Sequence, residues 1–352
     1  MKLKVAITCG DINGIGYEVI IKTLSEPHFS EICTPIIYGS MRTFSTHCNS
    51  IEDVHINANL INKATEAKAQ NVNLINCMDD NVNVQFGEIT QEAGKAAFSA
   101  LERATNDLKN GFVDVLVTAP INKENIQSDK FKFHGHTEYI EAKFATENQT
   151  SLMMLVSENI RMALVTNHLP LKEIAPAINK ELILRKINIF NESLKKDFGV
   201  RKPRIAVLAL NPHAGDSGLL GNEEIEIIEP TIVQANKNNI LAFGPYSSDG
   251  FFGAGTYRNF DGILAMYHDQ GLIPFKTLEM DNGVNFTAGL DVVRTSPDHG
   301  TGYNIAGKNQ ANEQSFRSAL YAAIDIYGMR NMNEELSENP LRIRDKRINN
   351  RE

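Results

Sequence analysis

Short apolar runs alternate with helix-like stretches along most of this 352-residue chain. Residues 4–8 (KVAIT) and 204–210 (RIAVLAL) are continuous apolar runs bounded by polar or turn-forming residues, which is typical of buried strands. Residues 91–110 and 179–198 carry apolar positions at helical spacing, and each stretch is closed by a glycine, a common helix stop. The alternation predicts an α/β fold with a mainly parallel sheet and helices outside it.

Three segments depart from this simple alternation. The runs LMMLVS (residues 152–157) and RMALVTNH (161–168) lie close enough along the chain to form a hairpin. Residues 41–85 are rich in asparagine and weakly periodic, so we expect a peripheral β or irregular segment there. Residues 333–352 lack apolar periodicity, and we expect them to form a flexible tail.

Composition and charge narrow the class of protein. The chain is 42% hydrophobic and 22% charged, which is ordinary for a soluble globular protein. Its net charge of −8 argues against nucleic acid or a membrane as partner, so an anionic ligand would need a local basic pocket. No apolar run approaches the ~20 residues of a membrane span, and the N-terminus has no signal-peptide pattern. The four cysteines lack CxxC spacing and are interpreted as reduced thiols, which favours a cytoplasmic protein.

Three of the apolar runs end at a histidine: His168 in RMALVTNHLP, His213 in RIAVLALNPHAG and His268 in DGILAMYHDQG. The carboxyl ends of strands in open α/β sheets converge on the ligand crevice, so three imidazoles there can share one divalent metal. Imidazole ligands favour Zn or Co over Mg. Asp269 could orient a ligand imidazole or join the metal's ligands, and its alternative role is a turn cap. The alternative for each histidine by itself is a hydrogen-bonded structural residue.

Two further groups of polar residues point to an anionic ligand. In the motif HGHTE, His136 and Thr137 stand where a helix begins, which is a natural anion site, although Thr137 alone could be an N-cap. Lys276, Asn285 and Arg294 follow the last histidine, and the two cations could neutralise a phosphate and a carboxylate. Solvated surface charges are the alternative for these cations.

Two glycine-rich segments could bind a nucleotide. Gly10, Asp11, Gly14 and Gly16 follow the first strand and precede a helix, but their spacing is not G-x-G-x-x-G, so a Rossmann fingerprint is not supported. A second segment, residues 298–307 (DHGTGYNIAG), could let a nucleotide approach the backbone closely. Either segment could also be a tight structural turn.

The motifs GDINGIG, VTAPINK, GHTE, NHLP, LNPHAG, MYHDQG and HGTGYNIAG occur in this order between Gly10 and about Tyr327. The chain thereby resembles the 4-hydroxythreonine-4-phosphate dehydrogenase (PdxA) family of pyridoxal phosphate biosynthesis. The resemblance implies an isocitrate/isopropylmalate-dehydrogenase-like fold, with two α/β subdomains and an active-site cleft between them. Residues 1–130 with 285–330 would form the first subdomain, and residues 131–284 the second, which would carry the metal ligands and the dimer interface.

The resemblance also implies an activity. It is the NAD(P)- and divalent-metal-dependent oxidation of 4-phosphooxy-L-threonine to 2-amino-3-oxo-4-phosphooxybutanoate, which decarboxylates to 3-amino-2-oxopropyl phosphate. The implied metal is Zn, Co or Mg, and the implied assembly is a homodimer with its active site at the subunit interface. The family's metal ligands fall on His168, His213 and His268, and its substrate-binding residues fall on His136, Thr137, Lys276, Asn285 and Arg294.

The roles of the remaining candidate residues are less specified by the resemblance. The nucleotide would lie on the first glycine-rich loop and on His299, Gly300 and Thr301. His136 and Asp269 are the candidate catalytic residues, because either could accept the proton of the substrate hydroxyl.

The choice of nucleotide and the choice among related functions stay open at this point. The family loop GDPAGIGPE reads GDINGIGYE here, with Ile12, Asn13 and Tyr17 as replacements, so the choice between NAD and NADP stays open. A paralogue acting on 4-phospho-D-threonate or 4-phospho-D-erythronate would keep the same site residues. A three-histidine zinc lyase or hydrolase would need no NAD, and a non-enzymatic binding protein would leave the polar residues at the strand ends without a purpose.

Overall fold

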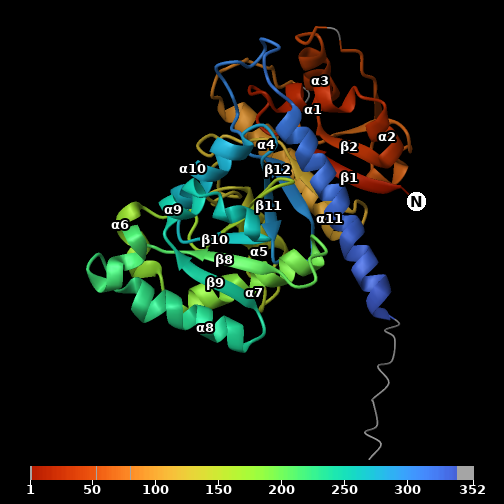
Figure 1. Cartoon of the computed structure of the whole chain (residues 1–352). Coiled ribbons are helices and arrows are strands. Elements are labelled where there is room, and N and C mark those ends of the chain that lie inside the picture. The colour runs from red at the N-terminus through yellow and green to blue at the C-terminus, as the bar shows by residue number, and fades with distance from the viewer. Residues whose placement is uncertain (1, 53, 80, 339–352) are drawn as a thin grey trace, which may run out of the picture.

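The structure is a computed structural model that describes residues 2–52, 54–79 and 81–338. Its strands join one 12-stranded sheet in the order β3-β4-β2-β1-β5-β12-β11-β6-β7-β10-β8-β9 (Figure 1). The strands are β1 (Leu3–Thr8), β2 (Cys33–Gly39), β3 (Ala58–Ile61), β4 (Val72–Asn76), β5 (Val115–Thr118), β6 (Leu152–Val156), β7 (Arg161–Leu164), β8 (Arg204–Leu208), β9 (Leu241–Tyr246), β10 (Gly262–Ala265), β11 (Val284–Ala288) and β12 (Arg294–Pro297).

Helices connect the strands and cover the sheet. They are α1 (Gly16–Leu24), α2 (His28–Ile32), α3 (Met41–Cys48), α4 (Gln91–Lys109), α5 (His136–Phe144), α6 (Leu171–Ala177), α7 (Lys180–Lys196), α8 (Glu229–Lys237), α9 (Ser248–Gly253), α10 (His268–Glu279) and α11 (Gln314–Glu338). In the part of the chain that the structure describes, no helix is both long and apolar enough to cross a membrane.

The predicted α/β class with a mainly parallel sheet is confirmed. Eight strand pairs are parallel and three are antiparallel. The predicted hairpin is confirmed as the antiparallel pair β6–β7. The antiparallel pairs gather in the middle of the sheet, where β11 lies between β12 and β6. The predicted subdomain boundary at residue 285 therefore falls inside a strand that pairs with both halves of the sheet.

Two expectations from the sequence need correction. Residues 41–85 contain the helix α3 as well as strands β3 and β4, so this segment is not only β or irregular. Ser40 caps α3, because its Oγ accepts a hydrogen bond from the Thr43 backbone N–H. The expected tail begins too early at Asn333, because α11 continues to Glu338 and the Asn333 side chain donates to the Lys196 carbonyl at 3.0 Å. The rest of the predicted tail, residues 339–352, lies outside the described residues.

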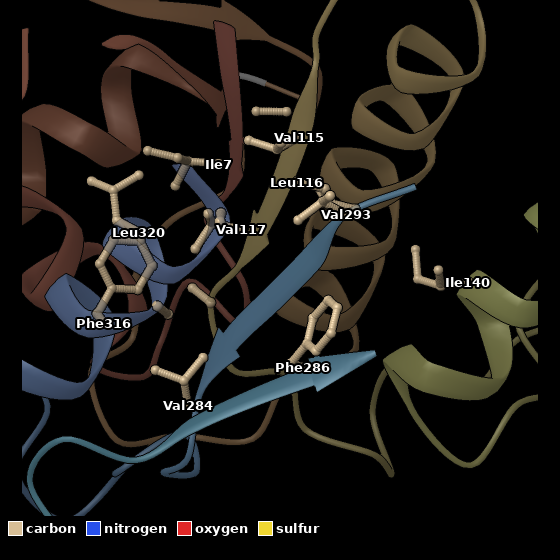
Figure 2. Packing of buried hydrophobic residues seen from close by; sticks show 14 of the residues in the cluster. Ile7, Val115, Leu116, Val117, Ile140, Val284, Phe286, Val293, Phe316 and Leu320 are labelled. Atoms are coloured by element: carbon tan, nitrogen blue, oxygen red, sulfur yellow. The ribbon is translucent and has the colours of Figure 1, made fainter. Parts of the chain in front are cut away.

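The largest core cluster lies against the centre of the sheet. Figure 2 shows Phe316 and Leu320 of α11 near Val117 of β5 and Val284 of β11. All four side chains are at most 2% exposed. Removing such side chains from water is the main favourable contribution to folding. The packed core therefore fixes the positions of β1 and β5, from whose ends the loops of the candidate site extend.

A buried ion pair connects α11 to α7. The Arg330 Nε lies 2.6 Å from Asp197 Oδ1, and both residues are at most 5% exposed. The guanidinium also donates to the carbonyls of Leu290 and Asp291, and the Ser193 hydroxyl donates to the second oxygen of Asp197. Every charge of the pair is thus hydrogen-bonded, as burial requires.

Replacing Arg330 by Ala should lower the free energy of unfolding by about 3–5 kcal/mol, because Asp197 would stay buried without its partner. Urea unfolding of the purified protein measures this change. Arg185→Ala, which removes an exposed arginine from α7, is the matched control and should change stability by less than ~0.5 kcal/mol. A loss below 1 kcal/mol in the Arg330 variant would contradict the structural role of the pair.

Candidate active site

Three loops meet at the ends of the central strands. The loop after β1 contacts the loop after β5 through a hydrogen bond from the Asp11 N–H to the Pro120 carbonyl at 2.9 Å. It contacts the segment after β12 through a hydrogen bond from the Ile15 N–H to the Thr301 carbonyl, also at 2.9 Å. The two glycine-rich segments that the sequence singled out are therefore direct neighbours.

Asp11 holds these loops together. It is 1% exposed, and its Oδ1 accepts the Asn13 N–H at 2.9 Å. Its Oδ2 accepts hydrogen bonds from the Asn125 amide at 2.7 Å and from the Tyr303 hydroxyl at 2.9 Å. Both carboxylate oxygens thus accept hydrogen bonds from protein groups, and Asp11 fixes the shape of the loops.

The glycines of the first loop serve packing within the protein. A Cβ on Gly10, which has a φ of +68°, would collide with the Pro120 carbonyl, and one on Gly14 would collide with the Thr301 carbonyl. Gly16 is packed in the same way against the Cys9 carbonyl. Gly300 differs, because a Cβ there would meet no atom within 4 Å. Among the predicted nucleotide-binding glycines, Gly300 is therefore the one that faces open space.

Tyr17, which departs from the family pattern, supports the first loop together with His47. The two rings stack with centroids 4.9 Å apart, and the His47 Nε2–H donates to the Ile12 carbonyl at 2.8 Å. The Tyr17 hydroxyl accepts the Ser40 N–H at 3.0 Å. Burial lowers the pKa of His47 to about 4, so the imidazole is neutral at neutral pH.

This burial makes stability depend on pH. The pKa of His47 falls from 6.5 to about 4 on folding, so between these values the unfolded chain binds a proton that the folded chain does not. The His47 contribution to stability should therefore fall by about 2 kcal/mol between pH 7.5 and pH 5. Urea unfolding at both pH values should show this loss in the wild type and not in His47→Gln. His55→Gln, at an exposed position, is the control, and equal pH dependence in all three proteins would refute the assignment.

The motif HGHTE opens α5, as the sequence predicted. His136 is the first helical residue, and Thr137 behind it is 8% exposed. The His136 Nε2 is buried and has no hydrogen-bond partner among the described residues. Burial, with the nearby charges of Arg294 and Lys123, holds the pKa of His136 well below its usual range. His136 is therefore a neutral imidazole with a ring nitrogen available to a ligand.

Arg294 lies beneath this helix start as the first residue of β12 and is 2% exposed. Its Nε and Nη2 donate to the Thr118 hydroxyl at 3.1 and 2.6 Å, and its Nη1 donates to the Thr287 hydroxyl at 3.3 Å. Burial lowers the pKa of Arg294 to about 9, and the charge of Glu138 opposes part of that effect. The hydrogen-bond partners are neutral hydroxyls, so this cation is suited to bind an anionic group.

Lys276 and Asn285 line the same region from α10 and β11. The Lys276 ammonium lies 3.3 Å from Asp298 Oδ1 and donates to the Asp298 carbonyl at 3.2 Å. Burial raises the pKa of Asp298, and the charges of Lys276 and His268 oppose this shift. The Asn285 Oδ1 is buried and has no hydrogen-bond partner within residues 2–52, 54–79 and 81–338. A second cation and an unused amide oxygen thus accompany Arg294.

Two of the three predicted metal ligands lie together. The rings of His168 and His268 have centroids 5.7 Å apart. The His268 Nδ1 lies 2.7 Å from Asp269 Oδ1, and the His168 Nδ1 lies 3.5 Å from Glu138 Oε1. Metal-binding histidines commonly pair one ring nitrogen with a carboxylate and bind metal through the other. This pair of imidazoles therefore fits a borderline divalent cation such as Zn or Co.

The third predicted ligand, His213, does not join them within this chain. Among residues 2–52, 54–79 and 81–338, no three histidine, cysteine or carboxylate side chains gather closely enough to hold a metal. His213 is exposed, and residues 213–217 all have positive φ, which turns the loop after β8 into a left-handed coil. The expectation of three ligands meeting at one point is therefore not met by the single subunit.

Several buried polar atoms in this region have no hydrogen-bond partner among the described residues. They are His136 Nε2, Glu138 Oε2, Asn167 Oδ1, Asn285 Oδ1 and His299 Nε2. Buried polar atoms are nearly always hydrogen-bonded in folded proteins, so atoms without a partner in these motifs are suited to contact a ligand. The sequence had not assigned a role to Glu138 or Asn167, although both lie in the motifs GHTE and NHLP beside assigned residues.

A mainly parallel sheet with buried cations and imidazoles near its strand ends is typical of α/β enzymes that act on anionic small molecules. Comparisons with known proteins agree. The sequence profile of the family described as pyridoxal phosphate biosynthetic protein PdxA matches residues 31–323. The chain belongs to the PdxA family, and it is a dehydrogenase, an oxidoreductase acting on a CH–OH group.

Individual relatives cover nearly the whole chain. The chain is 55% identical to a 4-hydroxythreonine-4-phosphate dehydrogenase of Bacteroides thetaiotaomicron over 97% of its own length and 93% of the relative. It is 36% identical to a relative from Cutibacterium acnes provisionally named D-threonate 4-phosphate dehydrogenase, over 91% and 92% of the two chains.

A solved structure shares the fold as well. The crystal structure of 4-hydroxythreonine-4-phosphate dehydrogenase from Klebsiella pneumoniae superposes with a TM-score of 0.81 at 33% identity, covering 93% of this chain and 98% of that one. The fold class predicted from the sequence is thereby confirmed.

Proposed function

We propose that this PdxA-family dehydrogenase oxidises 4-phosphooxy-L-threonine with NAD or NADP in pyridoxal 5'-phosphate biosynthesis. The product, 2-amino-3-oxo-4-phosphooxybutanoate, would lose CO2 to give 3-amino-2-oxopropyl phosphate. The observation that carries the proposal is the buried Arg294, whose hydrogen-bond partners are neutral, beside the unpaired Nε2 of His136. The name of the relative that is 55% identical supports the choice of substrate.

The residues of the crevice suit a substrate with two anionic groups. Arg294 and Lys276 would bind the phosphate and the carboxylate, and Thr137 and Asn285 offer hydrogen bonds beside them. Neutral His136 can accept a proton at Nε2, which makes it one candidate for the group that deprotonates the substrate hydroxyl, with Asp269 as the other.

The same crevice would hold a divalent metal, Zn, Co or Mg, on His168 and His268 with His213 as third ligand. When bound, such an ion supplies Lewis acidity that lowers the pKa of the hydroxyl and stabilises the anion formed on loss of CO2. The nicotinamide nucleotide, NAD or NADP, would lie along His299, Gly300 and Thr301, where Gly300 is open and the His299 Nε2 is unpaired.

We infer a cytoplasmic homodimer in which a second subunit completes each site. His213 is exposed and apart from the other two histidines. Large apolar side chains flank the ligand loops on the surface, with Leu171 76% and Leu219 79% exposed. Large apolar side chains that stay exposed in one subunit are often covered at a subunit interface. A dimer would cover them and could bring His213 of one subunit to His168 and His268 of the other.

A second candidate substrate is 4-phospho-D-threonate or 4-phospho-D-erythronate. The relative from Cutibacterium acnes, named for D-threonate 4-phosphate, is 36% identical to this chain. This substrate carries a hydroxyl in place of the amine, so it would use the same anion and metal contacts.

Purified protein should reduce NAD or NADP with 4-phosphooxy-L-threonine, and a chelator should abolish the reaction. The absorbance of the reduced nucleotide measures turnover, and 4-phospho-D-threonate serves as the parallel substrate. Turnover of D-threonate phosphate alone would replace the proposed substrate by the second candidate. Absence of turnover with both would refute the proposed function.

His213→Ala should lower turnover by at least ~100-fold while the protein stays folded, because the metal would lose one of three ligands. Circular dichroism checks the fold. His55→Ala, which removes an exposed histidine of the N-terminal half, is the matched control and should keep full activity. Full activity of the His213 variant would exclude this residue from the metal site.

A further inference from the structure

We propose that Glu138 is the positioning residue of the metal centre, with its Oε1 fixing the His168 ring and its Oε2 reserved for a donor group of the bound substrate. This inference rests on the proposed function, since it assumes that His168 is a metal ligand. It assigns a role to a residue that the sequence motifs had left without one.

Glu138 lies next to the Nδ1 atom of His168, which leaves the Nε2 atom of the ring for a metal. Its Oε1 lies 3.5 Å from the His168 Nδ1. The His168 ring in turn lies next to His268, at 5.7 Å between centroids. An imidazole that gives Nε2 to a metal carries its proton on Nδ1 and needs an acceptor there. Glu138 is placed to be that acceptor, and it would fix both the tautomer and the ring orientation.

A matching contact on His268 supports this interpretation. The His268 Nδ1 lies 2.7 Å from Asp269 Oδ1. Both neighbouring imidazoles therefore have a carboxylate at Nδ1, and both leave Nε2 as the ligand atom. Two such pairs at one crevice are expected of a metal centre, whereas isolated structural histidines have no reason to share this arrangement.

The second oxygen of Glu138 distinguishes it from the structural carboxylates of this chain. Asp11 and Glu224 are at most 1% exposed, and each has both oxygens hydrogen-bonded to protein groups. The Glu138 side chain is 31% exposed, yet its Oε2 is buried and lacks a partner among the described residues. In a carboxylate with a purely structural role, we expect every buried oxygen to accept a hydrogen bond from a protein group.

The Glu138 carboxylate lies close enough to Arg294 for its charge to act on the guanidinium. Arg294 is the residue proposed to bind an anionic group. A substrate held there also carries hydroxyl and amine donors, and a carboxylate accepts hydrogen bonds without donating any. Oε2 is therefore suited to select a donor group of the substrate next to its anion.

Titration of the metal-free protein with Co2+ by calorimetry tests the proposal without using activity. Glu138→Ala should weaken Co2+ binding by about 10- to 100-fold. Glu138→Gln should weaken it less, because the amide oxygen still accepts the Nδ1–H of His168. Glu173→Ala removes an exposed carboxylate from α6, close to His168 in sequence, and should bind Co2+ as the wild type does.

Steady-state kinetics at saturating Co2+ test the second oxygen. Both Glu138 variants should show a raised KM for 4-phosphooxy-L-threonine, since neither offers a free carboxylate oxygen to the substrate. A residue that only stabilises the start of α5 would lower the melting temperature and leave Co2+ affinity and KM unchanged. That result in Glu138→Gln would overturn the proposal even if Glu138→Ala failed to fold.

The outcomes separate this inference from the proposed function. Wild-type protein that binds Co2+, with Glu138→Ala binding it equally well, would refute the role of Glu138 alone. Wild-type protein that binds no Co2+ would refute the metal centre and the role of Glu138 together. Weaker Co2+ binding by Glu138→Ala in a protein that oxidises neither substrate would support the role of Glu138 and reject the proposed substrate.

Discussion

The burial of the Arg294 guanidinium at the centre of the sheet is the constraint on which the site depends. The side chain is 2% exposed, and its hydrogen bonds go to the hydroxyls of Thr118 and Thr287, so it joins β12 to β5 and β11. Taking a cation out of water costs several kcal/mol unless an anion compensates for it. The packed centre of the sheet holds the strands in place despite this desolvation cost. A bound anionic ligand would offset part of the desolvation free energy of the guanidinium.

The charge of Arg294 interacts with two titratable side chains of α5, His136 and Glu138. Burial, together with the positive charge of Arg294, holds the pKa of His136 well below its usual range. The Glu138 carboxylate partly compensates Arg294 and reaches His168 on its other side. The proposed anion site and the proposed metal site would therefore meet at the start of α5.

The sequence predicted the sheet class and the β6–β7 hairpin, because buried strands leave local signals in the pattern of apolar residues. Strand-end histidines led to His168 and His268, whose rings lie together, and the roles of the site residues stay predictions. The sequence did not predict α3, whose asparagine-rich surroundings hide the periodicity, although Ser40 is a usable cap signal. It could not predict that the Asp11 carboxylate accepts hydrogen bonds from Asn125 and Tyr303, since these residues lie 114 and 292 positions away in the sequence. Nor could it show that positive φ values from residue 213 onward would keep His213 apart.

Anomalous diffraction at the cobalt edge, from crystals of the wild-type protein grown with Co2+, is the most direct test of the proposed metal centre. We expect one cobalt peak bonded to the Nε2 atoms of His168 and His268, with Glu138 and Asp269 at their Nδ1 atoms. We also expect a His213 imidazole to complete the site. A cobalt peak elsewhere, or no peak between these two imidazoles at saturating Co2+, would refute the proposed metal centre.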